Sequence, residues 1–344
     1  MEQALTKDNL EPMTPTDAKE MYLSQRESEV SQSTIQAHHY RLKHFVRWCD
    51  EVAEIDNLNE LTGRDLQRYK MWRRDDGDLN NVTMVTQLST IRVFIKWCEN
   101  IDAVASGTHD KILLPSLGKT EDRRTAMLSE EAAKQLLEYL RQFEFATRTH
   151  ALIEVLWHTG IRIGAAHSLD VEDYDRKEQY LELHHRPETG TRLKNKTGGE
   201  RYVSLSANVC DALDAYLQYN REEGEDDEGR SPLFSSPSGR PAKSTLRDSI
   251  YRITRPCEYT GECPHDREID SCEALERNKA STCPSSVSPH AIRRGAITQH
   301  LSKDVPEKIV SDRMNVGLDV LEKHYDQRGE REKADQRRDY LEDI

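Results

Sequence analysis

The first hundred residues contain two long segments in which apolar side chains recur at helical spacing. STIQAHHYRLKHFVRWCDEV and VTMVTQLSTIRVFIKWCENI, at 33–52 and 82–101, each place five apolar residues on one face of a helix. Those stripes are Ile35, Leu42, Phe45, Cys49 and Val52, and Val85, Leu88, Ile91, Ile95 and Cys98. GRDLQRYKMWRR predicts a shorter helix between them, and Thr14 before Pro15 begins another. A helical domain of about four helices is therefore expected over residues 14–103, after a tail at 1–13.

The 344 residues suffice for two domains, and the periodicity stops where a linker would lie, at 104–127. A second domain is expected at 128–344, beginning with Ser129 as a helix N-cap. It contains a buried helix at THALIEVLWHTG and a short β region from residue 180. Within that region, TRLKNKTGGERYVSL predicts two strands joined by a Gly-Gly turn. The expected fold class is mainly α with a small β-hairpin or sheet.

The chain is acidic, with a net charge of −13, which at first argues against a nucleic-acid partner. Six carboxylates, however, fall in REEGEDDEGR alone, and the basic residues are 32 Arg against only 17 Lys. Excess carboxylates with few lysines are typical of proteins kept soluble in concentrated salt, so we expect a halophilic origin; an ordinary acidic protein is the alternative. Concentrated salt screens the repulsion between an acidic protein and DNA, so such a protein can still have a DNA-binding face.

No run of about 20 apolar residues predicts a membrane span, and the acidic start MEQALTKDNLEP lacks the apolar core of a secretory signal. A cytoplasmic location is expected, with the seven cysteines reduced.

Four separate segments contain candidate site residues of types that bind anions or act in catalysis. HTGIRIGAAHSLDVEDYD has Arg162 after a Thr-Gly break, LKNKTGGERYVSL has Lys196 at an expected hairpin tip, and DVLEKHYDQR has Tyr325. SPHAIRRG places His290 and Arg293 three apart on one helical face, where they could hold an anion. Each feature alone has an ordinary explanation: a surface arginine, a solvated lysine, a polar helix start or a packing tyrosine.

In this order, the four segments resemble the tyrosine recombinase (phage integrase) family, in particular its Xer-like members and, given the composition, a haloarchaeal type. The resemblance covers nearly the whole chain. It implies that residues 14–103 are a SAM-like, DNA-binding core-binding domain and that residues 128–344 are the catalytic domain.

The resemblance also implies the chemistry. Arg162 and Arg293 would bind the non-bridging oxygens of a DNA phosphodiester, and Tyr325 would attack the phosphorus to give a 3′-phosphotyrosine. Lys196 would protonate the leaving 5′-oxygen and His290 would exchange a proton with the tyrosine. No cofactor is expected for catalysis. The implied partners are double-stranded target sites and three further copies, in a homotetramer on paired sites that passes a C-terminal segment such as 330–344 between neighbours.

One position departs from the family pattern. The residue nine places before the tyrosine, usually His or Trp, is here Val316, which cannot donate a hydrogen bond, whereas the adjacent Asn315 can. Two alternatives to a recombinase therefore stay open: a catalytically impaired DNA-binding protein that retains the fold, and a topoisomerase-like relaxase or resolvase.

A cysteine-rich insertion occupies residues 257–283. Its four cysteines could bind a structural Zn²⁺ tetrahedrally, with His265 as a substitute for one ligand; these cysteines are Cys257, Cys263, Cys272 and Cys283. The spacing contains no C-x2-C pair, so free thiols in a loop are the alternative.

Overall fold

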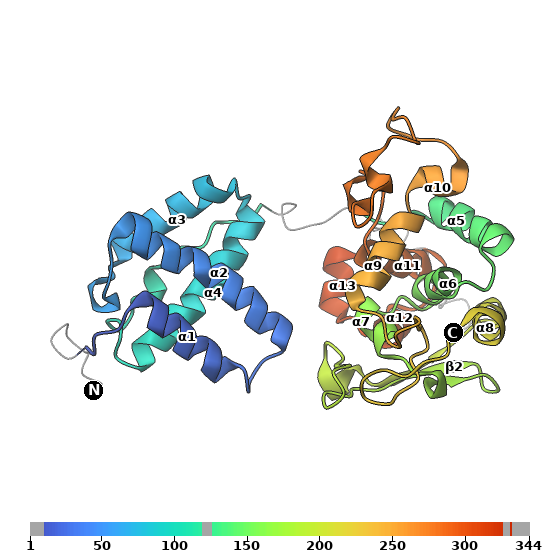
Figure 1. Cartoon of the computed structure of the whole chain (residues 1–344), viewed down its shortest axis with the longest axis horizontal. Coiled ribbons are helices and arrows are strands. Elements are labelled where there is room, and N and C mark those ends of the chain that lie inside the picture. The colour runs from blue at the N-terminus through green and yellow to red at the C-terminus, as the bar shows by residue number, and fades with distance from the viewer. Residues whose placement is uncertain (1–9, 119–125, 326–330, 332–344) are drawn as a thin grey trace. The chain divides into compact units, whose positions relative to one another are not determined.

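The computed structural model describes residues 10–118, 126–325 and 331, without the side chains of 322–324. The chain divides within the segment 119–125 into two compact units, which are described separately (Figure 1). Among the described residues, no helix is both long enough and apolar enough to span a membrane.

The first unit is built from four helices: α1 (Pro15–Arg26), α2 (Gln32–Trp48), α3 (Gly63–Gly77) and α4 (Asn81–Asn100). Thr14, Ser31, Thr62 and Asn80 cap their N-termini through side-chain oxygens, as expected for these residue types. The core is rich in aromatic side chains at most 1% exposed, among them Tyr22, Phe45, Trp48, Tyr69 and Phe94. The prediction of about four helices is confirmed.

Two details of this unit differ from expectation. Val52 is 50% exposed, because α2 passes at Cys49 into a π-helical turn, Cys49–Ala53, whose wider spacing rotates later residues off the apolar stripe. Part of the predicted linker also packs on the unit: Val104 and Ile112 are buried in its core, and Arg92 donates to the Ile112 carbonyl. These two residues were assigned to the linker because isolated apolar residues outside a helix produce no periodic pattern in the sequence.

The second unit is mainly helical. Its helices are α5 (Glu130–Phe143), α6 (Arg148–Thr159), α7 (Ile163–Ser168), α8 (Ala207–Ala215), α9 (Lys243–Ile253), α10 (Pro256–Thr260), α11 (Pro289–Ser302), α12 (Glu307–Met314) and α13 (Leu318–His324). α11 lies at the centre: all seven residues 291–297 are buried, and the helix packs on α6. Gly295 permits this packing, since a Cβ there would lie 2.1 Å from the Leu128 carbonyl oxygen. The expected fold class, mainly α with a small sheet, is confirmed.

The sheet has three antiparallel strands in the order β1 (Tyr174–Asp175), β2 (Tyr180–Leu183) and β3 (Arg201–Ser204), with Leu181 opposite Val203. The predicted strand pairing inside TRLKNKTGGERYVSL is wrong, because β3 pairs with β2 instead. Leu193 turns into the core, and a short 3-10 turn, Lys196–Gly199, replaces the Gly-Gly hairpin turn. Lys196 therefore lies on a long β2–β3 connection.

Candidate functional site

Arg162 projects from a turn between α6 and α7. Gly160 ends α6 in the left-handed conformation (φ +60°), and Arg162 then takes the N-cap position of α7. Its guanidinium is half-buried, and Nη1 donates to the carbonyl of Asn315, 3.0 Å away. The turn after α6 and the end of α12 are thus joined by this arginine.

Arg293, on α11, is only 2% exposed and donates to backbone carbonyls at the same two places. Nη1 donates to Gly160 at 2.6 Å and to Met314 at 2.7 Å, and Nη2 contacts the Asn315 carbonyl at 3.4 Å. Its Nε is buried without a hydrogen-bond partner in the described part of the chain. The two predicted arginines therefore share the carbonyl of Asn315.

Two further arginines, which the sequence analysis did not single out, extend this cluster. Arg201 on β3 donates through Nε to the Arg313 carbonyl and through Nη1 to the Gly199 carbonyl, both at 2.8 Å. Arg313 on α12 donates to the carbonyls of Ser204 (2.8 Å) and His158 (3.2 Å). Arg201 lies in the quoted segment KTGGERYVSL, but nothing in its spacing distinguished it from a surface residue.

No carboxylate of the described residues pairs with any of these four guanidiniums. Among the described side chains, no Asp or Glu oxygen lies within 4.0 Å of Arg162, Arg201, Arg293 or Arg313. Burial, then repulsion by Arg293, Arg162 and Arg313, lowers the pKa of Arg201 to about 10. Burial and Arg162 lower the pKa of Arg293 to about 10 as well, against an opposing effect of Tyr325. Among the described residues, this concentrated positive charge meets backbone carbonyls and, at Arg293, the Tyr325 side chain, but no carboxylate, which makes an anion its expected ligand.

Tyr325, directly after α13, lies beside this cluster. It is 5% exposed and packs with apolar residues such as Ile297 and Leu301. Burial lowers the pKa values of Arg162 and Arg293, and the nearby Tyr325 opposes this lowering in both. The exposed His290 faces it edge-on, with 6.4 Å between ring centroids. Four predicted site residues, Arg162, His290, Arg293 and Tyr325, are therefore brought together from three segments.

Lys196 is placed differently. Its side chain is exposed and its backbone is left-handed (φ +53°), on the β2–β3 connection. The residues on either side of it contact Asn315: Asn195 Nδ2 donates to Asn315 Oδ1 (2.6 Å), and Asn315 Nδ2 donates to the Gly198 carbonyl (3.1 Å). The lysine is thereby linked to the arginines through one residue.

Val316 has no polar role. It is 6% exposed and joins the apolar cluster of Ile297, Met314, Leu321 and Tyr325. Its side chain therefore supplies no hydrogen-bond donor, and the valine packs in the same cluster as the tyrosine.

The four cysteines of the insertion line one small cavity together with His265. Figure 1 shows this segment and the sheet at opposite ends of the second unit. Cys283 is buried, the other three are half-buried, and His265 Nε2 lies 2.9 Å from Ser285 Oγ. Among the described residues, no group of three or more His, Cys, Asp or Glu side chains is arranged to hold a metal ion.

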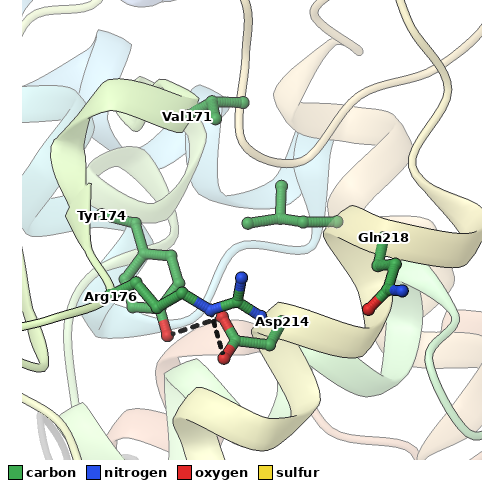
Figure 2. A pocket seen from close by; sticks show the side chains of 6 residues that line it. Val171, Tyr174, Arg176, Asp214 and Gln218 are labelled. Atoms are coloured by element: carbon green, nitrogen blue, oxygen red, sulfur yellow. Dashed lines mark hydrogen bonds and ion pairs between the residues drawn. The ribbon is translucent and has the colours of Figure 1, made fainter.

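A separate hollow of about 330 Å³ lies between β1 and α8 (Figure 2). Asp214 accepts from Tyr174 Oη at 3.1 Å and pairs with Arg176 at 2.7 Å, so the charges in this hollow neutralise each other. It offers no anion site comparable with the arginine cluster.

Comparison with known proteins matches both units. The signature of the phage integrase family covers residues 126–315, and that of the phage integrase N-terminal SAM-like domain covers residues 20–100. The chain belongs to the phage integrase family, and the resemblance to tyrosine recombinases is confirmed.

Two curated relatives illustrate the match. The chain is 25% identical to tyrosine recombinase XerC of Natranaerobius thermophilus over 57% of its own length, and covers 61% of that protein, less than two thirds. It is 22% identical to a probable integrase/recombinase protein of Methanocaldococcus jannaschii over 90% of this chain and 86% of the relative.

Two solved structures share the fold. The Tn1549 transposon integrase in complex with a circular intermediate DNA aligns over 95% of this chain and 99% of its own, at 14% identity and a TM-score of 0.68. A lambda integrase dimer bound to a COC′ core site aligns over 93% and 79%, at 13% identity and a TM-score of 0.64. At such identities the likeness shows the fold alone.

Inorganic phosphate should stabilise the free protein through the arginine cluster. A ligand at ten times its Kd adds about 1.4 kcal/mol to the free energy of unfolding, or a few degrees in Tm. Thermal unfolding in phosphate, against chloride at equal ionic strength, should show this increase. Arg162→Gln should lose most of it. Arg176→Gln, which removes an exposed arginine paired with Asp214, should keep it. An increase in Tm that persists in Arg162→Gln would mean that the anion binds elsewhere.

Proposed function

We propose that this protein is a site-specific DNA recombinase or integrase that cleaves and rejoins DNA through a 3′-phosphotyrosine intermediate. One observation carries the proposal: four arginines have no carboxylate partner in the described chain, and two of them, Arg162 and Arg293, lie beside the buried Tyr325. A DNA phosphodiester supplies the anion that the arginines lack and the phosphorus that the tyrosine attacks.

In the proposed reaction, the oxygen of Tyr325 forms a bond to phosphorus as the bond to the 5′-oxygen breaks. The tyrosine proton passes to His290, and Lys196 gives a proton to the leaving 5′-oxygen. Arg162 and Arg293 keep N–H groups that their carbonyl contacts do not use, and these stabilise the charge that grows on the non-bridging oxygens. Religation runs the same steps backwards with a 5′-hydroxyl as the attacking group.

Two alternatives were left open by the sequence. An impaired DNA-binding protein that retains the fold was considered because Val316 replaces a hydrogen-bond donor, but no comparison favours it. Against it, His290 and Tyr325 lie face to edge beside the arginines, an arrangement that DNA binding alone does not require. A relaxase or resolvase would use the same residues, and the topology of products made from one or two sites distinguishes it from a recombinase.

The proposed partners follow from the reaction. Residues 14–103 would act as the core-binding domain on double-stranded DNA, and a homotetramer would assemble on paired sites in the cytoplasm. The DNA-bound Tn1549 integrase and the lambda integrase dimer share the fold and support a DNA-bound assembly. The segment 330–344, expected to reach a neighbouring copy, lies outside the described residues except for residue 331.

Tyr325→Phe should abolish covalent adduct formation while DNA binding is retained, since the change removes only the nucleophilic oxygen. A substrate nicked beside the cleavage site traps the adduct of the wild type, which denaturing electrophoresis detects. Tyr202→Phe, at a tyrosine 63% exposed on β3, is the matched control and should cleave normally. An adduct formed by the Tyr325→Phe variant would show that another residue is the nucleophile.

We also propose a structural zinc ion in the cysteine-rich insertion. Support comes from the shared cavity of Cys257, Cys263, Cys272, Cys283 and His265. The side chains would have to draw closer to coordinate one ion, because the described residues contain no arrangement ready to hold it. Four thiolates, or three with the imidazole, would then close a tetrahedral site and fix the loop that leads into α11.

Freshly purified protein should accordingly contain about one zinc per chain by metal analysis, as four-ligand structural sites do. Cys272→Ser should lower both the zinc content and the Tm. Cys210→Ser, at a buried cysteine on α8 outside the cavity, should leave the zinc content unchanged. A metal-free preparation would overturn this proposal.

A halophilic origin remains our proposal, supported by the charge of −13 and the scarcity of lysine. Adduct yield and folding should both rise as KCl increases from about 0.1 M to above about 1 M, where the Debye length falls from about 10 Å to about 3 Å. Circular dichroism and adduct yield measured on the same samples test this. A protein fully folded at 0.1 M whose yield falls steadily with salt would be an ordinary acidic recombinase, since DNA binding normally weakens in this way.

A further inference from the structure

Asn315 occupies the junction between the arginines and the β2–β3 connection. It ends α12 in the left-handed conformation (φ +50°), which turns its carbonyl and its side chain towards different neighbours. The carbonyl accepts from Arg162 and Arg293, while the side-chain amide contacts Asn195 and Gly198. The backbone carbonyl of Asn315 therefore contacts the arginines, and its side-chain amide contacts the β2–β3 connection.

The orientation of the amide follows from its partners. The Gly198 carbonyl can only accept a hydrogen bond, so it must face the amide nitrogen of Asn315. The amide oxygen then faces Asn195, whose Nδ2 donates to it at 2.6 Å. Both hydrogen-bonding halves of the Asn315 amide are used on the connection.

We infer that Asn315 is a positioning residue for Lys196, holding the lysine's loop at a fixed place relative to the arginine pair. Asn195 precedes Lys196 and Gly198 follows it by two residues, so the contacts bracket the lysine. Lys196 itself has φ +53°, a conformation that a side-chain-bearing residue rarely adopts without support from its surroundings. This inference rests on the proposed function, in which Lys196 is the general acid.

The choice of asparagine at this position agrees with the inference. Only Gly and, less readily, Asn or Asp adopt the left-handed conformation without a large penalty. Glycine would hold the backbone equally well and would keep the carbonyl that Arg162 and Arg293 share. What asparagine adds is the amide, so Asn315→Gly removes the contact with the loop and keeps the contact with the arginines.

The experiment measures adduct formation on a nicked substrate with either an oxygen or a sulfur at the scissile 5′ position. Sulfur leaves without a proton, so a variant that has lost only the general acid recovers on it. General acids contribute roughly 10²–10⁴-fold to a rate. Asn315→Gly should therefore slow cleavage of the oxygen substrate by at least about 10-fold and come within about threefold of the wild type on sulfur, as Lys196→Ala should. The double variant should be no slower than Lys196→Ala alone.

Two controls make the result specific. Asn278→Gly changes an exposed asparagine of the cysteine-rich insertion that is also left-handed (φ +64°), and should cleave both substrates normally. Asn195→Ala removes the loop-side partner without touching α12, and should reproduce the defect on oxygen and its recovery on sulfur.

The outcomes separate this inference from the proposed function. No adduct from the wild type on either substrate would overturn the proposed function. A wild-type adduct with Asn315→Gly equally active on oxygen would overturn the inference alone. So would an equal loss on both substrates, because a structural or arginine-positioning defect does not depend on the leaving group.

Discussion

The second unit is organised around positive charge that has no carboxylate partner among the described side chains. Arg293 is buried in the core of the unit, where it contacts the Tyr325 side chain and donates to the carbonyls of Gly160, Met314 and Asn315; Arg162 donates to the last of these carbonyls as well. Each carbonyl satisfies a donor but leaves the charge in place. The turn after α6, the centre of α11 and the end of α12 must therefore meet at one point, and the attraction for a phosphate arises from the same contacts.

This arrangement works against the stability of the free protein. Burial and mutual repulsion lower the pKa values of Arg201 and Arg293 to about 10, which means that their charged forms are less favourable in the folded chain than in water. The surrounding apolar packing, with α11 buried on α6 and the cluster around Tyr325, must offset that cost. The arginines are thus in place before any anion binds, and a bound anion would relieve part of the repulsion.

Two kinds of feature could be predicted from the sequence: helices with a periodic apolar stripe, and site residues that occur in the order of a known family's motifs. Helical stripes identified the first unit, and the family resemblance indicated Arg162, His290, Arg293 and Tyr325, which the fold brings together. The sequence analysis did not identify Arg201, Arg313 or the two sets of contacts that Asn315 makes. Several of these contacts join a side chain to a backbone carbonyl more than a hundred residues away in the chain. Every residue has a backbone carbonyl, so the sequence cannot show which carbonyls will accept these hydrogen bonds. The strand predicted before Lys196 is absent from the structure for a related reason. Leu193 packs into the core of the unit, and the local alternation of apolar and polar residues does not predict that contact.

The carbonyls that hold Arg293 lie at the C-terminal ends of α6 and α12. A helix end of this kind carries about half a negative charge from its aligned peptide dipoles. The counter-charge of the site is therefore part of the backbone, and unlike a carboxylate it takes up no proton in acid. Substitution of side chains on these helices cannot delete it, provided that the helices form. The electric field at the phosphate position is consequently a property of the fold as much as of the arginines.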